Sequence, residues 1–572
     1  RQMSTDRIDA DTLAKQCHMS RQTLYRRLKK EGLGFHELVE EVRKDKAMRY
    51  VASDHYALGE IAFLLGFSEL SAFSRAFKRW TGMAPAQYRA RHLNIDNADV
   101  PWLPLALALI YLAAAACIYR ILMTYRVAQG AIAWILALIG LPYVAVPMFL
   151  LFGRNRFGGY IRARRTGDAA LTELLNHFEQ QTAAVSKRND EHVPDELQVL
   201  CKLGRQPFTT GNRCDLLKNG EATFEALFDA MENARHYILL EFYIVRSDKV
   251  GQRIKSILKR KLAQGVQVWF LYDDIGSVWL PRKYLRELAA AGAKVASFGD
   301  GNFRRMRLQV NFRNHRKLLV CDGEVGFVGG INLGDEYLGT AMDEEPWRDS
   351  HCRITGPAVT GLQLAWLEDW NWASEDFPTL NWTPSQPKPG NQEVLILPTG
   401  PADTYETCTL FFLNCINNAR TRIWIASPYF VPDVQIMNAL QLAALRGVDV
   451  RIIIPEKSDS RLIRLAAYSY LVQACRAGIG IYRYQPGFMH QKVVLVDDRY
   501  AAIGTANLDN RSMRLNFEIT AISTAVEFVS GIEHLLEQDL TTSRLMTERD
   551  YRDRSVAFRL TCRTIRLLGP LL

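Results

Sequence analysis

One sequence pattern occurs twice in this chain and constrains its fold more than any other feature. Residues 315–332 read HRKLLVCDGEVGFVGGIN, and residues 490–507 read HQKVVLVDDRYAAIGTAN. Both match H-x-K-x4-D-x6-G-x-x-N on apolar runs that are typical of β-strands. Two copies in register are hard to obtain by chance at ordinary residue frequencies. We therefore expect two related halves that build one bipartite active site.

The residue types of the repeat suit a phosphate diester substrate. Alternate residues of a strand face the same side, so the histidine and lysine of each copy point together. Lysine supplies a compact positive charge for phosphate oxygens. One imidazole can attack phosphorus and form a phospho-histidine, while the other serves as acid and then as base. The candidate catalytic residues are His315, Lys317, Asp322, His490, Lys492 and Asp497.

Two members of each copy have less certain roles. Asp322 and Asp497 fall at strand ends, where turn-forming roles are common, so a structural and a chemical role are equally compatible with the sequence. The Gly-x-x-Asn turns end at Asn332 and Asn507, and their amides can bind phosphate oxygen.

The internal repeat extends beyond the motif. Residues 234–245 parallel 419–431, residues 265–274 parallel 447–456, and residues 291–298 parallel 477–484. Each is a β-branched or aromatic run after a helical stretch, which predicts an α/β fold with a parallel or mixed sheet. The Pro-rich stretch 383–392 is the expected linker between halves. Strand ends supply further cleft candidates that suit a core role equally well: Glu241, Tyr243, Ser427, Tyr429 and Phe430.

Two uncharged runs precede the repeat, at residues 101–119 and 129–152. Each is long enough to cross a hydrocarbon core of ~30 Å, so we expect a transmembrane hairpin. An arginine cluster follows the second run: Arg154, Arg156, Arg162, Arg164 and Arg165. The excess of arginine predicts that the downstream region is cytoplasmic, and a hairpin puts the N-terminal region on the same side.

The paired motifs resemble the HKD motifs of the phospholipase D superfamily, although Gly330 and Thr505 stand where that family often has Ser. From about residue 101 onward, segments such as SPYFVP and GTANLDNRSMRLNFEI resemble the bacterial cardiolipin synthases. The resemblance implies two pseudo-symmetric halves and an acidic residue that orients each histidine, at Asp349 and Glu518. It implies transfer of a phosphatidyl group between two phosphatidylglycerols with release of glycerol, at the bacterial inner membrane. No metal or other cofactor is implied.

By family analogy, His315 is the expected nucleophile and His490 the acid and base. Phosphatidylethanolamine as donor, phospholipase hydrolysis and a nuclease acting on nucleic acid remain alternatives, because the motif serves both lipid and nucleic-acid diesters. A DNA-binding regulator with a fused lipid enzyme is a further alternative. The apolar hairpin favours a lipid. The net charge of +10 would attract anionic phospholipids, and the tail 551–572 is either a basic amphipathic membrane-surface segment or a core helix.

Residues 1–92 contain two helix-turn-helix-like units, at 11–32 and 58–91, that resemble the DNA-binding domain of AraC-type regulators. Ala14 and Ala62 are expected packing residues, and Ser20 and Ser68 expected helix caps. The resemblance places the second helix of each unit in the major groove. The candidate DNA contacts are Arg21, Gln22, Arg26, Ser71 and Arg75. The alternative is that these side chains form the solvated face of a helical bundle.

We expect the following order of segments: a DNA-binding domain (1–92), a transmembrane hairpin (101–152), a cytoplasmic linker (153–204), two phospholipase D-like halves (205–385 and 393–550) and the basic tail (551–572). The chain begins with Arg1, which is compatible with a fragment, a gene fusion or an assembly error. Its ten scattered cysteines are expected to be free thiols.

Overall fold

The computed structural model describes residues 10–53, 55–96, 102–124, 128–153, 160, 194–299, 311–339, 347–385 and 389–569. The arginine cluster predicted to follow the membrane segment lies outside these residues. The chain forms two compact units, Arg1–Leu112 and Ala113–Leu572.

The N-terminal unit is helical, as expected. Its helices are α1 (Ala10–Gln16), α2 (Arg21–Lys30), α3 (Phe35–Ala52), α4 (Leu58–Leu64), α5 (Leu70–Thr81) and α6 (Pro85–Asp96). Ala14 and Ala62 are both buried, as predicted for packing residues. Ser20 caps α2 by accepting a hydrogen bond from the Thr23 N–H group. The prediction that Ser68 caps the following helix is wrong, because Glu69 is the N-cap residue of α5.

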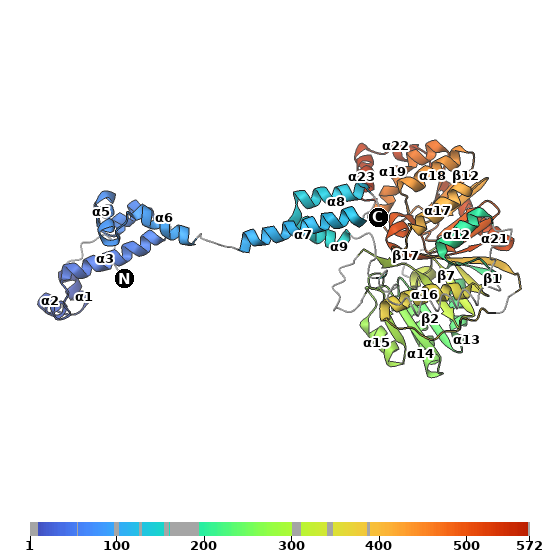
Figure 1. The fold of residues 1–572 in the computed structure, drawn as a ribbon, viewed down its shortest axis with the longest axis horizontal. Coiled ribbons are helices and arrows are strands. Elements are labelled where there is room, and N and C mark those ends of the chain that lie inside the picture. Colours follow the sequence, from blue (N-terminus) through green and yellow to red (C-terminus); the bar gives the residue numbers. More distant parts are fainter. Residues whose placement is uncertain are drawn as a thin grey trace. The chain divides into compact units, whose positions relative to one another are not determined.

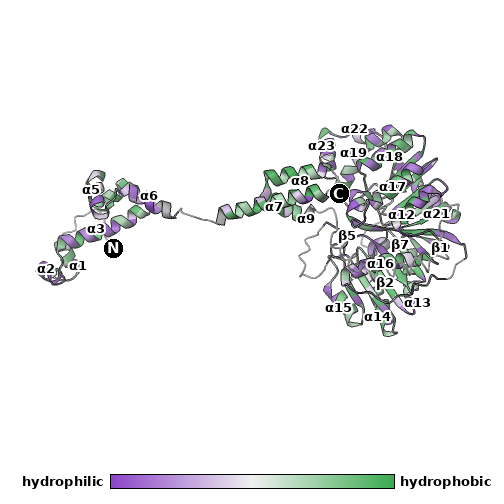
Figure 2. Cartoon of the chain, in the orientation of Figure 1, coloured by the Kyte–Doolittle hydropathy of each residue, from purple (hydrophilic) through white to green (hydrophobic). Residues whose placement is uncertain are grey.

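The two apolar runs fold differently from each other. The first forms α7 (Trp102–Thr124), which over Pro104–Thr124 is long and apolar enough to span a membrane. It is the only such helix in the described part of the chain. The second run is broken into α8 (Ala128–Gly140) and α9 (Pro142–Phe152), both strongly apolar (Figure 2). The two-span hairpin therefore stays a prediction.

The break in the second run has a local cause. Pro142 has no backbone N–H group and disfavours helical backbone at the residue before it, so α8 ends before this point and α9 begins at Pro142. Leu141 accordingly adopts φ −139° and ψ 59°, outside the helical region. The rings of Trp134 and Phe149 then meet with centroids 5.3 Å apart, so α9 turns back along α8. Each helix is shorter than the ~20 residues that cross a bilayer.

The second unit is built on one mixed sheet whose strand order is nearly palindromic. The described strands follow the order β18-β13-β12-β10-β14-β15-β17-β9-β1-β8-β7-β6-β2-β3-β4. β1 and β9 pair antiparallel at the centre, so each half contributes an equivalent set of strands on one side. The α/β fold with a mixed sheet is confirmed, and its two halves are related as the sequence repeat predicted.

The strands of the first half are β1 (Thr209–Lys218), β2 (Tyr237–Phe242), β3 (Gln267–Tyr272), β4 (Lys294–Ser297), β5 (Arg313–Asn314), β6 (Lys317–Cys321), β7 (Val325–Gly329) and β8 (Ser350–Thr355). Those of the second half are β9 (Gln392–Thr399), β10 (Arg422–Ala426), β11 (Phe430–Val431), β12 (Asp449–Pro455), β13 (Gly480–Tyr484), β14 (Val493–Val496), β15 (Tyr500–Gly504), β16 (Leu508–Asp509), β17 (Asn516–Ser523) and β18 (Ser543–Leu545).

Helices cover both faces of this sheet (Figure 1). The first half carries α13 (Asn219–Asn233), α14 (Lys249–Ala263), α15 (Arg282–Ala290) and α16 (Val359–Ser374). The second carries α17 (Thr407–Asn418), α18 (Val434–Leu445), α19 (Arg461–Ala477), α20 (Asn510–Arg514) and α21 (Val526–Thr541). Alternate strand residues enter different cores: Ile238 and Leu240 join one, and Leu239 joins the other.

Two segments outside the predicted halves also belong to the folded region. α12 (Asp195–Gly204), expected in the linker, buries Leu197 and Leu200 in the core of the second half. The predicted tail forms α22 (Arg549–Arg552) and α23 (Val556–Arg566), which pack on α19. Cys562 and Ile565 are the buried residues of α23, so this helix is amphipathic with one face in the core and the other exposed.

Candidate active site

The first motif histidine is positioned by a contact between the two halves. β5 of the first half pairs in parallel with β17 of the second. The His315 N–H group continues this pairing by donating to the carbonyl oxygen of Phe517 at 2.9 Å. His315 is thereby placed beside Glu518, the next residue of β17, and its ring Nδ1 lies 2.8 Å from Glu518 Oε2.

The second motif histidine is held by the equivalent contact in the opposite direction. Arg348 of the first half forms a parallel bridge with Met489 of the second. The His490 N–H group donates to the Arg348 carbonyl at 2.7 Å. The ring Nδ1 of His490 then lies 2.8 Å from Asp349 Oδ2. Each histidine is therefore oriented by a carboxylate from the other half.

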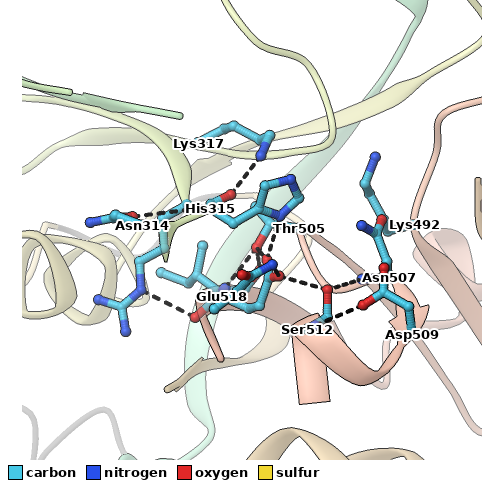
Figure 3. A network of polar contacts seen from close by, with 12 residues as sticks. Asn314, His315, Lys317, Lys492, Thr505, Asn507, Asp509, Ser512 and Glu518 are labelled. Carbon is cyan, nitrogen blue, oxygen red and sulfur yellow. Dashed lines mark hydrogen bonds and ion pairs between the residues drawn. The ribbon is translucent and has the colours of Figure 1, made fainter. Parts of the chain in front are cut away.

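Glu518 lies at the centre of a dense polar network (Figure 3). Besides His315, it accepts hydrogen bonds from the Thr505 hydroxyl at 2.6 Å, the Ser512 hydroxyl at 2.7 Å and the Asn516 amide at 3.1 Å. Burial raises the pKa of Glu518, but the His315 ring, the Lys317 ammonium and the Thr505 hydroxyl outweigh it, so the pKa is lowered overall. Glu518 is therefore an ionised, fixed acceptor for the His315 ring.

The environment of Asp349 is simpler. It accepts from the backbone N–H of Ser350 at 2.7 Å and from His490. Gly330 occupies the position equivalent to Thr505, so no hydroxyl reaches this carboxylate from there. A Cβ atom added to Gly330 would stand 2.1 Å from Asp349 Oδ1, which explains why this position has no side chain. The departure of Gly330 and Thr505 from the Ser of the family pattern thus makes the two halves of the site unequal.

The two lysines lie deep in the site. Lys317 is fully buried, and its ammonium donates to the carbonyl of His315 at 2.6 Å. The ammonium of Lys492 lies 2.9 Å from Nδ1 and 3.1 Å from Nε2 of His490. Among the described residues, no hydrogen-bond partner reaches Nε2 of His315, so this nitrogen is the one open to a substrate. The rings of Tyr243 and His315 pack at an interplanar angle of 66°, with their centroids 4.9 Å apart.

Both histidines are neutral in this environment. Burial lowers the pKa of His315 to about 4, against the opposing charge of Glu518. Burial also lowers the pKa of His490 to about 4, with Lys492 acting in the same direction. Each lysine contributes to the pKa of both histidines, so the two motifs share one electrostatic site. Burial lowers the pKa of Lys492 to about 8.

The motif aspartates lie at the far ends of their strands from the histidines. Asp322 has φ +57° and accepts from the backbone N–H groups of Arg235, His236 and Tyr237. Asp497 has φ +52° and accepts from the N–H groups of residues 420–422. Both carboxylates therefore hold the backbone at the start of a neighbouring strand. The geometry supports a structural role for these aspartates over a chemical one.

The motif asparagines also have structural partners. Asn332 accepts from the Ile244 N–H at 3.0 Å and donates to the Tyr337 hydroxyl at 3.0 Å. The N–H group of Asn507 donates to the Ser512 hydroxyl at 3.0 Å, while its side-chain oxygen is buried without a partner among the described residues. A phosphate-binding role therefore stays a prediction, and it fits Asn507 better than Asn332.

Sequence reasoning missed a second pair of carboxylates behind the motifs. Asp369 on α16 pairs with Arg316, the residue between His and Lys of the first motif, at 2.8 Å. Asp539 on α21 accepts from Gln491, the residue at the same place in the second motif, and pairs with Arg348. The signal was available, because these aspartates occupy equivalent helices of the repeat. Their buried contacts fix both motif strands against the helices.

The other cleft candidates serve the surrounding structure. Glu241 is buried beside Asn314, and burial raises its pKa well above the usual range. The Ser427 hydroxyl accepts from the Leu508 N–H at 3.0 Å, and the Tyr429 hydroxyl donates to Asp459 at 2.7 Å. Phe430 is a core residue of the second half. Of this group, Tyr243 alone touches a motif histidine in the described contacts.

A doubled α/β fold whose two His–Lys motifs meet in one buried site defines a phospholipase D-like enzyme. The family model described as "Cardiolipin synthase, PLD-like domain" matches residues 227–345 and 412–540, one segment in each half. The crystal structure of phosphatidylserine synthase from Haemophilus influenzae Rd KW20 has the same fold, with a TM-score of 0.50 and 15% identity. The superposition covers 66% of this chain and 100% of the phosphatidylserine synthase chain.

Curated relatives are much closer in sequence. Cardiolipin synthase A of Pseudomonas fluorescens SBW25 is 44% identical over 468 residues, which is 81% of this chain and 96% of the relative. Cardiolipin synthase A of Pseudomonas aeruginosa LESB58 is 46% identical over 461 residues, covering 80% and 93%. The chain therefore belongs to the cardiolipin synthase family and is an enzyme of that family.

The N-terminal unit has its own match. A helix-turn-helix domain model matches residues 13–91. The five predicted DNA contacts are all exposed on α2 or α5. Arg21 pairs with Asp11 at 3.0 Å, and Ser71 and Arg75 both lie near Glu69. These intramolecular contacts are solvent-exposed and weak, so they leave the side chains available to a stronger anionic partner.

Proposed function

We propose that this enzyme transfers a phosphatidyl group from one phosphatidylglycerol to another, releasing glycerol, through a covalent intermediate on His315. The observation that carries the proposal is the crossed arrangement of two histidines, each oriented by a carboxylate of the other half. Such a carboxylate fixes the proton on Nδ1 and leaves Nε2 to react. The Pseudomonas relatives, named as cardiolipin synthases, support phosphatidyl transfer as the reaction.

In the first step, Nε2 of His315 attacks phosphorus and a P–N bond forms. His490 takes up a second proton from water when the phosphate anion binds, and it gives this proton to the glycerol oxygen as the P–O bond to the headgroup breaks. In the second step, the glycerol hydroxyl of another lipid loses its proton to His490 and attacks phosphorus, and the P–N bond breaks. Lys317 and Lys492 offset the charge on the phosphate oxygens in both steps. A substrate anion raises the proton affinity of His490, which prepares it to act as the acid.

The choice between alcohol and water as acceptor decides between a synthase and a hydrolase. His315 and His490 are only 8% and 6% exposed, so little water reaches them, and a lipid alcohol concentrated in the bilayer competes well. The test uses the full chain in phosphatidylglycerol vesicles, with lipid products resolved by mass. We expect a four-chain lipid together with an equal amount of glycerol. Phosphatidic acid as the sole product would establish a hydrolase instead.

The pH profile provides a second test of the site. Because the pKa of Lys492 is lowered to about 8, its positive charge is present below that pH and is lost above it. Above pH 8, kcat/KM should lose a further factor of about ten per pH unit, in addition to any slope already present below pH 8. This is the loss expected when one more essential proton dissociates. Lys492→Arg should remove this additional loss, whatever its absolute rate, because arginine stays charged. An unchanged slope in that variant would show that another group titrates.

We also propose that residues 101–152 anchor the enzyme in the bacterial inner membrane, with the catalytic region and the N-terminal module both cytoplasmic. The arginine-rich sequence after residue 152 supports a cytoplasmic catalytic region. A module that binds DNA must also face the cytoplasm. This topology needs α8 and α9 to cross the bilayer together. If they stay folded back along each other, the N-terminal module lies on the opposite side.

Cys17 allows this topology to be measured, because it is the only exposed cysteine among the ten. A membrane-impermeant maleimide should leave Cys17 unmodified in intact spheroplasts and modify it after lysis. Modification in intact spheroplasts would place the module outside the cytoplasm.

For the module itself, we propose DNA binding through α2 and α5. The full chain should discriminate among genomic fragments at raised salt, whereas purely nonspecific binding would contradict sequence recognition.

A further inference from the structure

A basic groove lies on the second half, outside the catalytic residues. It has a volume of about 850 Å³ and is formed by α18, α19, α22 and α23. None of the described residues that line it is acidic, and five are arginines: Arg476, Arg552, Arg559, Arg563 and Arg566. Figure 1 shows α19, α22 and α23 gathered at one edge of the second half.

The positive charge of this groove is largely uncompensated. Arg476 and Arg552 share a single carboxylate, that of Glu548. Arg559, Arg563 and Arg566 on α23 form no ion pair within the described part of the chain. Like charges at this spacing repel one another, so the groove gains stability from an anion that enters it. Guanidinium groups match phosphate oxygens in geometry as well as in charge.

One arginine of the groove is already held in place. The Arg566 guanidinium stacks over the Tyr470 ring at 4.2 Å from its centroid and donates to the Ser469 carbonyl. Stacking fixes the orientation of the group at low conformational cost and leaves N–H donors for a ligand. The groove is therefore partly organised before any ligand binds.

The rim of the groove is apolar, and this identifies the ligand. Val556 and Leu560 line the groove and are 70% and 64% exposed, and Leu567 beyond them is 79% exposed. Aliphatic side chains among arginines on the outer face of a helix are typical of segments that lie in a membrane interface. We propose that this groove is a binding site for the phosphate headgroups of anionic phospholipids at the bilayer surface, separate from the catalytic site.

The apolar rim favours lipid over other anions. Free phosphate or nucleic acid would use the arginines but would leave Val556, Leu560 and Leu567 in water. A lipid headgroup places its phosphate among the arginines while the same surface enters the interfacial layer. The site would keep α23 on anionic regions of the membrane, and it holds independently of which reaction the catalytic residues perform.

The test is hydrogen–deuterium exchange of the full chain in lipid nanodiscs, which needs no turnover. Replacing zwitterionic lipid with phosphatidylglycerol should slow exchange in residues 556–568. In R559Q/R563Q, the phosphatidylglycerol fraction needed for half of this protection should rise about 30-fold or pass out of range, since each interfacial arginine contributes roughly a fivefold affinity. R253Q/K259Q on α14 removes the same charge from exposed positions outside the groove and should behave as wild type.

Two further arms distinguish the sources of phosphate. Zwitterionic discs with added inorganic phosphate, or with duplex DNA, should leave exchange in α23 unchanged. Protection by either of these and not by phosphatidylglycerol would overturn the proposal, as would wild-type exchange that does not respond to anionic lipid. Equal loss in R253Q/K259Q would also overturn it, because the effect would then be one of net charge and not of the groove.

Discussion

His315→Ala is expected to lower phosphatidyl transfer by about 10⁴-fold or more, since loss of a nucleophile removes the covalent route. The expectation rests on the open Nε2 of His315, whereas both ring nitrogens of His490 lie within 3.1 Å of the Lys492 ammonium. His490→Ala should be equally inactive on phosphatidylglycerol, because the glycerol leaving group then receives no proton. Turnover in vesicles measures both losses, and thermal unfolding checks that each variant is folded.

The two variants differ in what they accumulate. With a donor whose leaving group is a good anion, such as a nitrophenyl ester of phosphatidic acid, His490→Ala should release one equivalent of nitrophenol and stop. The trapped phosphatidyl group should then be found on His315 by mass spectrometry. His315→Ala should release none. A phosphatidyl group on His490 of the wild type would reverse the assignment.

The repeat in the sequence predicted much of the fold. Paired motifs with matching flanking strands led to two equivalent halves, and the sheet order around β1 and β9 has that symmetry. The sequence could not predict which carboxylate serves which histidine. That pairing depends on β5 with β17 and on Arg348 with Met489, contacts between residues far apart in the chain.

The membrane region illustrates a different limit. Hydropathy measures the length of an apolar run but not whether its helix is continuous. Pro142 interrupts the second run, and the resulting α8 and α9 pack on each other through Trp134 and Phe149. Strand-end aspartates were ambiguous for a related reason. A carboxylate next to a motif strand suits chemistry and capping equally, and only the backbone N–H partners of Asp322 and Asp497 distinguish the two.

The crossed carboxylates lead to the second large effect. Glu518→Gln and Asp349→Asn preserve the shape of side chains that are fully buried. The amide can no longer fix a proton on Nδ1 of the histidine. In a comparable catalytic triad, this change lowers kcat by about 10⁴-fold. By comparison with that triad, we expect the rate of phosphatidyl transfer from phosphatidylglycerol to fall by about 10³- to 10⁴-fold in both variants. Circular dichroism and thermal unfolding should first confirm that each variant retains its fold.

The activated donor separates the two roles. Glu518 orients the nucleophile, so Glu518→Gln should remain slow with the nitrophenyl ester. Asp349 orients the acid, which this leaving group does not need, so Asp349→Asn should recover most of its first-step rate. If each carboxylate instead served the histidine of its own half, Asp349→Asn would stay slow and Glu518→Gln would recover. Burst kinetics of nitrophenol release in the two variants therefore decide whether the site is assembled across the halves.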